Sequence, residues 1–550
     1  MSSFHIRDEN NLTEEEMLWL LENDCVEYNA ILEEDVTSDM ENEDHVSDHE
    51  EIDDVIVADD DEDTNIPDGP HYTAKDGTQW SKMPLSKRVR RSEANKIVAA
   101  PGLTHSSSEI STIRESFLLF FSDAMLDIIV IETNRKAKYF FDQHNATHPG
   151  NTKKFAPTNR IEIEAYIGLL ITLGALQANT EPIEMLYCSD PAYCRPIIPA
   201  CLSRNRYSFI TKFIRYDNFE TREQRKLQDR LAPIRDIFDI LVSNCKTALN
   251  PSSHMCVDEQ LVPFRGRAPF RVYMKSKPAK YGIKIWALAD CEFNYTVNMQ
   301  VYLGKQGNKP EKKQGKRVVL ELTDHLQQGY GITTDNFFTS LELANKLLMK
   351  KLTLCGTLRK NKAFIPRELL PSASKKEYSS MFAFQKNCVL VSYVPKKSRA
   401  VILLSNEHQD DKVNSAEMKY KPDILLHYNN TKGAVDATDQ MAQKYTTQRR
   451  TLRWPMVLFY HMIDIAALNA YKIWTIKNPN YEIGHLDARR KFLLALGKDL
   501  AKENIINRYN KANGLNAGPK ENILKVFPEL RKEAVLQERQ PARFKYGVNI

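Results

Sequence analysis

The sequence has few of the features that mark a secreted or membrane-embedded protein. Its nine cysteines in 550 residues are too sparse for a disulfide framework. No cationic start followed by an apolar run opens the chain, as a signal peptide would require. The longest apolar run, YIGLLITLGAL at 166–176, is too short to cross a bilayer. We therefore expect a soluble intracellular protein with free thiols and no membrane partner.

Cysteine and histidine are also scarce where a zinc module would need them. Cys188, Cys194 and Cys201 are close in sequence, but their gaps differ from the paired CxxC ligands of zinc sites. The last cysteine is Cys388, and residues 480–550 contain a single histidine, His485. We predict a basic helical tail over 479–550 instead.

Basic residues are almost missing from the first 70 positions. These positions hold 26 aspartates and glutamates and one basic residue, Arg7, for a net charge of −25. The remaining positions hold 75 lysines and arginines against 46 acidic residues, for a net charge of +29. We predict a disordered acidic tail over 1–75. It either screens a basic body that binds a polyanion, or binds another protein, or only aids solubility.

A short basic cluster follows the tail, within a linker predicted over 76–107. Its members are Lys87, Arg88, Arg90 and Arg91. The cluster is interpreted as a nuclear-import signal or a contact to the DNA backbone, and a solvated linker explains it equally well. On the first interpretation the protein is nuclear.

The hydrophobic pattern divides the rest of the chain into segments. Apolar residues recur at helical spacing over 108–250. An apolar run at 254–264 and alternating patterns at 282–290 and 295–304 predict strands. Helix and strand patterns then alternate as far as 360, which predicts a mixed α/β sheet. Residues 361–431 are predicted to be an insertion with at least two strands, and residues 432–478 return to helices.

Four aspartates occupy positions where a carboxylate is unfavourable unless it is exposed to water or paired with a positive charge. Asp258 lies in the middle of the first predicted strand, where a charge is costly unless it is paired or binds a metal. Asp335 ends a later strand, and Asp436 and Asp439 in KGAVDATDQM fall on one face of a helix. Either these carboxylates point into water or they surround something positive. Acidic clusters of this kind bind Mg²⁺, and paired metal ions serve phosphodiester chemistry.

Several longer blocks of sequence resemble piggyBac-family transposases. They are VDEQLVPFRGRAPFRVYMKSKPAKYGIKIWALAD, TTDNFFTS, GTLRKNK, YNNTKGAVDATDQM and RRTLRWPMVLFYHMIDIAALNAY, in this order between about residues 110 and 480. The resemblance implies an α/β fold in which a ribonuclease H-like core (251–360 and 432–478) carries an inserted β-rich domain (361–431). It also implies a helical domain for dimerisation and DNA binding over 108–250, and cut-and-paste DNA transposition at TTAA sites through hairpin intermediates.

The resemblance assigns roles to the four aspartates. Asp258 in VDEQ matches the first catalytic aspartate, and Asp335 in TDNFFTS matches the second. Asp436 matches the third, and Asp439 matches an additional required carboxylate. All four positions are intact, so we expect them to be catalytic and to bind Mg²⁺ or Mn²⁺. The expected partners are the transposon ends, the TTAA target and a second copy of the chain.

Basic residues close to these aspartates are expected to hold the DNA. They are Arg265, Arg267, Arg271, Lys275, Lys277, Lys280 and Lys284, which follow Asp258, and Arg449, Arg450 and Arg453, which follow Asp439. If they contact phosphates, binding weakens steeply as the salt concentration rises. Each of them is alternatively part of a solvated face.

The resemblance ends before the carboxyl-terminal segment. Many family members end in a Cys/His-rich zinc domain that recognises the transposon ends, and we expect this chain to lack it. Two hypotheses therefore stand beside an active transposase. One is a domesticated piggyBac-derived protein that binds DNA or chromatin without transposition, and the other is a nuclease that cuts without joining. The intact aspartates favour the transposase, and the missing zinc domain favours the domesticated protein.

Overall fold

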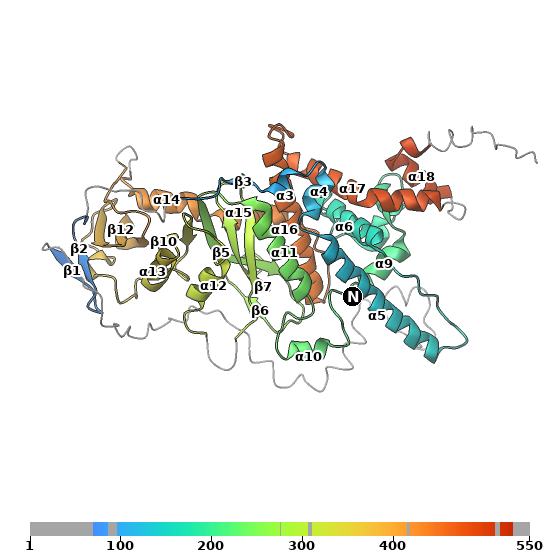
Figure 1. Cartoon of the computed structure of the whole chain (residues 1–550), viewed down its shortest axis with the longest axis horizontal. Helices are drawn as coiled ribbons and strands as arrows, with labels where there is room; N and C mark the ends of the chain where they lie inside the picture. Colours follow the sequence, from blue (N-terminus) through green and yellow to red (C-terminus); the bar gives the residue numbers. More distant parts are fainter. Residues whose placement is uncertain are drawn as a thin grey trace, which may run out of the picture.

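The structure is a computed structural model of the chain and describes residues 70–85, 96–275, 277–305, 311–414, 419–511 and 517–531. Most of the predicted acidic tail and the basic cluster at 87–91 lie outside the described residues. Within the described ranges, no helix is both long and apolar enough to cross a membrane. Figure 1 shows an elongated molecule with a β-rich end, a central sheet, and a helical part at the opposite end.

A mixed sheet forms the centre of the molecule, as the alternating patterns predict. β5 (His254–Pro263) runs parallel to β9 (Gly331–Thr334), which runs parallel to β10 (Thr353–Thr357). β7 (Tyr281–Asp290) lies antiparallel to β5 and pairs with both β8 (Thr296–Val301) and β6 (Arg271–Tyr273). Helices α12 (Gln314–Leu322) and α13 (Leu341–Met349) connect the strands from β8 to β10. The strand order in the centre is therefore β8–β7–β5–β9–β10.

The inserted strands continue this sheet and do not form a second one. β11 (Ser380–Gln385), β12 (Cys388–Lys396) and β13 (Arg399–Ser405) make an antiparallel meander, and β13 pairs with β10. The hairpin β1 (His71–Thr73) and β2 (Gln79–Ser81) extends the sheet beyond β11. The indole nitrogen of the buried Trp80 donates to the carbonyl of Phe364 at 2.9 Å. Residues 71–81, predicted as tail and linker, are thus part of the β-rich end.

The helical part is built around two apolar helices, α6 (Arg160–Ala175) and α16 (Trp454–Lys477). Pro455 lies in the first turn of α16, where the missing N–H has no intrahelical partner to lose. The longer helices around them are α4 (Ile113–Leu118), α5 (Asp123–Thr147), α9 (Arg204–Phe213), α11 (Arg235–Ala248) and α17 (Ala488–Asn510). Short elements complete this part: α3 (His105–Ser108), α7 (Ile183–Leu186), α8 (Ile197–Cys201), α10 (Arg222–Lys226), β3 (Gly102–Leu103) and β4 (Leu249–Asn250).

The segment after residue 479 is not a separate tail where the structure describes it. α17 packs along α6, and α18 (Ala517–Val526) packs against α8. The two long helices meet at Gly168 and Gly497, where a Cβ built on either glycine would lie 2.7 Å from the carbonyl oxygen of the other. This close approach makes α17 part of the core of the helical domain.

Candidate active site at the end of β5 and β9

Two of the predicted aspartates lie side by side on neighbouring strands. In the parallel pair β5–β9, Val257 is opposite Thr334. The next residues along the two strands are Asp258 and Asp335, and parallel neighbours are about 4.8 Å apart. The register therefore brings together two carboxylates that are 77 positions apart in the sequence.

Helix α15 (Ala434–Lys444) brings the other two aspartates over the same strand. The Cys256 thiol donates to the carbonyl of Lys432 at 3.1 Å, just before α15 begins. The side-chain amide of Gln260 donates to the Thr438 hydroxyl at 3.4 Å, inside α15. Alternate residues of a strand share a face, so α15 crosses the face of β5 on which Asp258 lies.

A lysine ammonium lies among these carboxylates. Lys277, in the loop between β6 and β7, donates to a carboxylate oxygen of Asp436 at 3.2 Å and to the carbonyl of Glu259 at 3.0 Å. Burial lowers the pKa of Lys277, but the charge of Asp436, with those of Asp258 and Glu259, outweighs burial and leaves this pKa raised. A positive charge beside the helical aspartates is thus present as a side chain of this chain, where a metal ion was expected.

The half-buried carboxylates are costly to ionise. Burial, followed by the charges of Glu259 and Asp335, raises the pKa of Asp258 to about 7. Burial and the charge of Glu259 raise the pKa of Asp335 to about 6, although nearby backbone N–H groups and Arg359 act in the opposite direction. Burial also raises the pKa of Asp439. A divalent cation would hold all three in the ionised form.

The four carboxylates have the right chemistry for such a cation, but their oxygens do not form a closed set of ligands. Carboxylate oxygens are the ligands that Mg²⁺ and Mn²⁺ prefer. Among the described residues, however, the four aspartates do not form a group of three whose ligand atoms all lie within 4.8 Å of one another. The structure sets Asp258 beside Asp335 and lays the helix of Asp436 and Asp439 over β5 without closing a ligand cage, and a shared metal site stays a prediction.

Comparisons with known proteins identify the family of the chain. A family model described as Transposase IS4 matches residues 113–471, more than half of the chain. The human PiggyBac transposable element-derived proteins 3 and 2 are 23% and 24% identical to this chain, over 75% and 70% of its length. The chain belongs to the piggyBac transposase family. It spans about two thirds of the length of these human relatives, with 68% and 65% covered.

A solved structure extends the likeness to three dimensions. It is a cryo-EM structure of a piggyBac transposase synaptic complex with hairpin DNA, and it is 32% identical to this chain. The match covers 82% of this chain and 94% of that one, with a TM-score of 0.72. The predicted α/β fold with a ribonuclease H-like core is therefore confirmed. The sheet of that core has the strand order β8–β7–β5–β9–β10.

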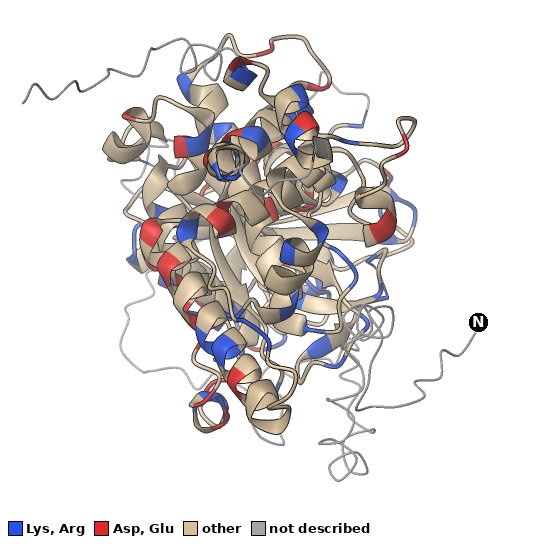
Figure 2. Cartoon of the chain, turned by 90° about the vertical axis from the view of Figure 1, so that its right-hand side faces the viewer, with Lys and Arg blue, Asp and Glu red and all other residues tan. Residues whose placement is uncertain are grey.

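Five of the predicted DNA contacts of this transposase-family chain are exposed. In the described part of the chain their side chains form no hydrogen bond or ion pair: Arg265, Arg267, Arg450, Lys275 and Lys280. The three arginines come from two adjoining loops, because a Cβ on Gly266 would lie 3.2 Å from the carbonyl of Leu452. Figure 2 shows the molecule from its helical end, where basic and acidic residues are mixed along the helices. We call the two loops that carry Arg265, Arg267 and Arg450 the arginine loops.

Two lysines were predicted as DNA contacts and have other roles. Lys284 is only 4% exposed, and its ammonium lies 5.1–5.7 Å from the ring centres of Trp286, Tyr302 and Phe337. The prediction for Lys284 is therefore wrong, because a buried ammonium cannot reach a phosphate. Lys277 pairs with Asp436, as described above, and its side chain is 18% exposed.

Three arginines from the same prediction hold the backbone of the protein. Arg271 donates to the carbonyls of Arg265 and Gly266 at 3.0 and 3.1 Å. Arg449 donates to three carbonyls between residues 178 and 181, and Arg453 donates to three carbonyls between residues 211 and 214. Their guanidinium groups are engaged inside the protein, so we correct their role from binding DNA to holding backbone segments. Arg271 braces its own loop, and Arg449 and Arg453 hold segments of the helical part.

Glu259 belongs to the site and was not predicted from the sequence. Its charge raises the pKa of both Asp258 and Asp335, and its carbonyl holds Lys277. The signal was its position next to Asp258 in VDEQ. A single carboxylate beside a candidate ligand, on a strand where neighbours alternate between faces, gave no reason to count it as part of the site.

Proposed function

We propose that this chain is a cut-and-paste DNA transposase that uses Mg²⁺ or Mn²⁺. The observation that carries the proposal is the placement of Asp258 and Asp335 on adjacent strands beneath the helix that bears Asp436 and Asp439. Membership of the transposase family supports it. The matched synaptic complex contains hairpin DNA, and we extend that intermediate to this chain.

The aspartates would act as ligands of the metal ions. When bound, a pair of divalent ions supplies activation of the attacking oxygen and charge neutralisation at the leaving oxygen. Asp258, Asp335 and Asp436 would hold the pair, and Asp439 would support Asp436 from the next turn of α15. Lys277 pairs with Asp436 beforehand, and once a metal ion takes that carboxylate it would be free to pair with a DNA phosphate.

One site can serve every step of the proposed reaction. Water attacks a phosphodiester at the transposon end, and the strand breaks to give a 3′-hydroxyl. That hydroxyl attacks the opposite strand, which forms a hairpin and frees the flanking DNA. Hydrolysis reopens the hairpin, and the 3′-hydroxyl attacks a TTAA target. Each step is a displacement at phosphorus, so the same carboxylates and the same exposed arginines serve all of them.

The proposal includes where the protein acts and with what. A net charge of +29 beyond residue 70 suits a nuclear protein that binds double-stranded DNA. Two transposon ends must be held together for excision and joining, so we propose a homodimer as the active form.

A strand-cleavage assay tests the proposal. The substrate is a TTAA-flanked donor with terminal repeats taken from the DNA around the gene, incubated with Mg²⁺ or Mn²⁺. We expect nicks and hairpins from the wild type, and at least a hundredfold loss for Asp258→Asn. The matched control is Asp324→Asn, whose carboxylate is exposed and pairs with Lys350. Cleavage by Asp258→Asn at the wild-type rate would refute the site.

Lys277 gives a second candidate function a specific basis. Because its ammonium already pairs with Asp436, a lysine neutralises a carboxylate that the transposase reaction assigns to a metal. The human relatives are named as derived from transposable elements. The second candidate is therefore a domesticated protein that binds DNA without cutting it. Binding to transposon ends with no cleavage under either metal would favour this candidate.

A further inference from the structure

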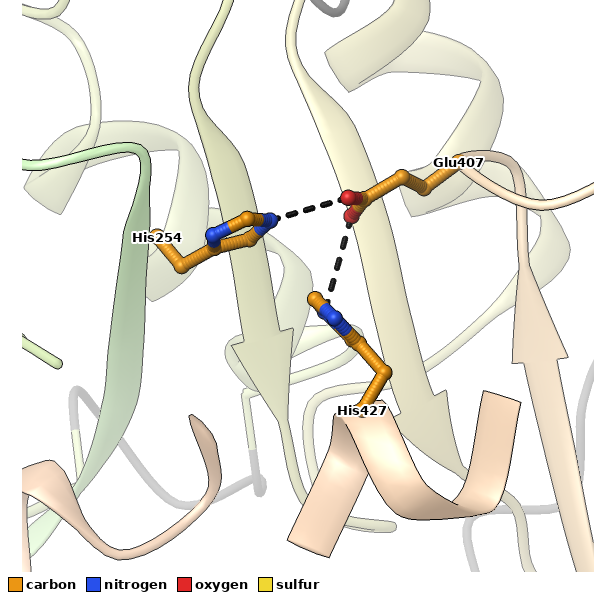
Figure 3. Close-up of side chains that lie close together, drawn as sticks. All are labelled: His254, Glu407 and His427. Atoms are coloured by element: carbon orange, nitrogen blue, oxygen red, sulfur yellow. Dashed lines mark hydrogen bonds and ion pairs between the residues drawn. The ribbon is translucent and has the colours of Figure 1, made fainter. Parts of the chain in front are cut away.

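Three side chains converge at the start of β5, away from the aspartates. His254 is the first residue of β5, Glu407 follows β13, and His427 lies in α14 (Asp423–Thr431), as Figure 3 shows. Nε2 of His254 lies 2.9 Å from one carboxylate oxygen of Glu407, and Nε2 of His427 lies 3.6 Å from the other. One ligand atom from each residue lies within 4.8 Å of the other two, and no other group in the described part of the chain meets this condition.

The surroundings orient these side chains toward one another. The Ser253 hydroxyl lies 2.7 Å from Nδ1 of His254, which occupies that nitrogen and leaves Nε2 directed at the carboxylate. Metal-binding histidines are held in this way through their second nitrogen. Nε2 of His427 is buried and has no hydrogen-bond partner among the described residues. A buried nitrogen without a partner is costly, and it points to a ligand.

A glycine makes the space for the cluster. Gly331 on β9 is the register partner of His254, and a Cβ at this position would lie 2.6 Å from the His254 ring and 3.0 Å from a Glu407 oxygen. Any other residue at position 331 would displace the imidazole or the carboxylate. The missing side chain at position 331 therefore leaves the space in which the ligand atoms lie close together.

We propose that His254, Glu407 and His427 bind a Zn²⁺ ion. Two imidazoles and one carboxylate suit zinc, whereas an all-oxygen set suits magnesium. Zinc–ligand distances of about 2.0–2.2 Å in a tetrahedron place the ligand atoms about 3.3–3.5 Å apart. The observed separations of 2.9 and 3.6 Å bracket that range, so small side-chain movements complete the site. A water molecule takes the fourth position.

The ion would join three parts of the chain that are distant in sequence. It links the first strand of the core, the end of the inserted strands, and the helix that leads through Gly433 into α15. His254 precedes Asp258 by four residues, about 13 Å along the strand, so the zinc site is separate from the aspartates. Its role is to fix α14 on the sheet and thereby to place α15 over β5.

Metal content of the full-length protein tests the proposal directly. Purified protein is stripped with a chelator, equilibrated with excess Zn²⁺, freed of loose metal by gel filtration, and analysed by mass spectrometry. We expect one zinc per chain in the wild type, and less than a fifth of that in His427→Gln and Glu407→Gln. His105→Gln, at an exposed position on α3, is the matched control and should keep the zinc. A wild type that retains no zinc overturns the proposal.

Two further measurements keep the result interpretable. Asp258→Asn should keep its zinc, so loss of catalysis and loss of zinc are separate outcomes. Co²⁺ in place of Zn²⁺ should give the visible absorption of a tetrahedral ion in the wild type, a readout that needs no variant to fold. Zinc that remains in His427→Gln, or disappears from Asp258→Asn, would place the ion elsewhere and contradict the assignment.

Discussion

At the scale of single residues, the proposed active site is a problem of charge balance. Asp258, Asp335 and Asp439 are half-buried with raised pKa values, and the ammonium of Lys277 pairs with the fourth aspartate, Asp436. Its partner Asp436 has a 64% exposed side chain, so the ion pair contributes no more than about 1 kcal/mol to stability. The greater effect of Lys277 should be on metal binding, because an ammonium and a divalent ion compete for the same carboxylates.

Replacing Lys277 tests this competition. Lys277→Met removes the ammonium and keeps an unbranched apolar side chain, so we expect Mg²⁺ to raise the melting temperature by several degrees more in the variant than in the wild type. Differential scanning fluorimetry across a Mg²⁺ titration measures both shifts. Lys280→Met is the control, since Lys280 is an exposed residue of the same loop. Equal Mg²⁺ shifts in Lys277→Met and wild type would show that the lysine does not compete.

Residue types, spacing and the family resemblance pointed to the aspartates as candidates, but not to their partners. Asp258, Asp335 and Asp436 lie within or next to short segments whose residue pattern predicts a strand or the start of a helix. Arg449 was predicted as a DNA contact because it follows Asp439 closely in the sequence, yet its guanidinium donates to carbonyls about 270 positions away. A cation held by distant backbone oxygens leaves no trace in its own neighbourhood, so the sequence cannot separate it from an exposed one.

At the scale of elements, a buried aspartate fastens the connection between α15 and α16. Asp464 in α16 accepts from the backbone N–H of Thr447 at 2.8 Å and from the Thr446 hydroxyl at 2.6 Å. These threonines lie between the helix of the candidate site and the arginine loops. Gly174 of α6 lets this connection pass closely, since a Cβ there would lie 2.4 Å from the Tyr445 carbonyl.

The anchoring aspartate makes stability depend on pH. Burial raises the pKa of Asp464 to about 7, and its hydrogen bonds oppose this only in part. The folded state therefore holds the proton more tightly than the unfolded state, whose carboxyl has its ordinary pKa near 3.8. The stabilisation is complete below about pH 4 and is lost as the pH rises to 7. At about 1.4 kcal/mol per unit of pKa difference, the loss is a few kcal/mol.

Asp464→Asn isolates this contribution from other titrating groups. The amide stays neutral at every pH, so the free energy of unfolding of the wild type relative to the variant should fall between pH 4 and 7 and then level off. Urea unfolding at intervals of one pH unit measures the difference. A difference that rises with pH would mean that the carboxylate is stabilised in the folded state, contrary to the burial argument.

The crossing of α6 and α17 supplies a second prediction at this scale. A Cβ on Gly497 would lie 2.2 Å from the Thr172 hydroxyl and 2.7 Å from the Gly168 carbonyl, so the helices would have to separate. We expect Gly497→Ala to destabilise the protein by about 1–3 kcal/mol, although alanine favours a helix over glycine by about 1 kcal/mol.

The control for this crossing is another helical glycine. Gly518 in α18 has no atom within 4 Å of a built Cβ, so Gly518→Ala should be neutral or slightly stabilising. Chemical unfolding of both variants measures the two free energies. If Gly497→Ala were as stable as Gly518→Ala, the helices would not be held at this distance by the glycine pair.

Element types were predictable here, and their assembly was not. The helical spacing after residue 479 predicted α17, but only the facing glycines show that this helix belongs to the core. The apolar run of β13 predicted a strand, but pairing with β10 joins segments almost 50 positions apart. Periodicity reports which face of an element is buried, and it carries no information about the element that covers that face.

At the scale of the whole molecule, the excess of positive charge is useful to DNA only where it is unpaired. Many basic residues of the helical part are already used internally, for example Arg206 with Glu162 and Arg222 with Asp217. The arginine loops are different, because their three side chains are exposed and come from two segments that follow Asp258 and Asp439 in the sequence. We therefore expect them to supply phosphate contacts close to the reacting strand.

Removing the charge of the arginine loops should weaken DNA binding without changing its sequence preference. In the triple variant Arg265→Ala, Arg267→Ala and Arg450→Ala, each lost phosphate contact lowers the slope of log affinity against log salt by about 0.9. The affinities for transposon-end and unrelated duplexes should fall by the same factor, since phosphates carry no sequence information. Fluorescence anisotropy at several salt concentrations measures the slope for both duplexes. The triple lysine variant at these positions keeps the charge and should keep the slope, whereas an unchanged slope in the alanine variant would move the DNA path away from these loops.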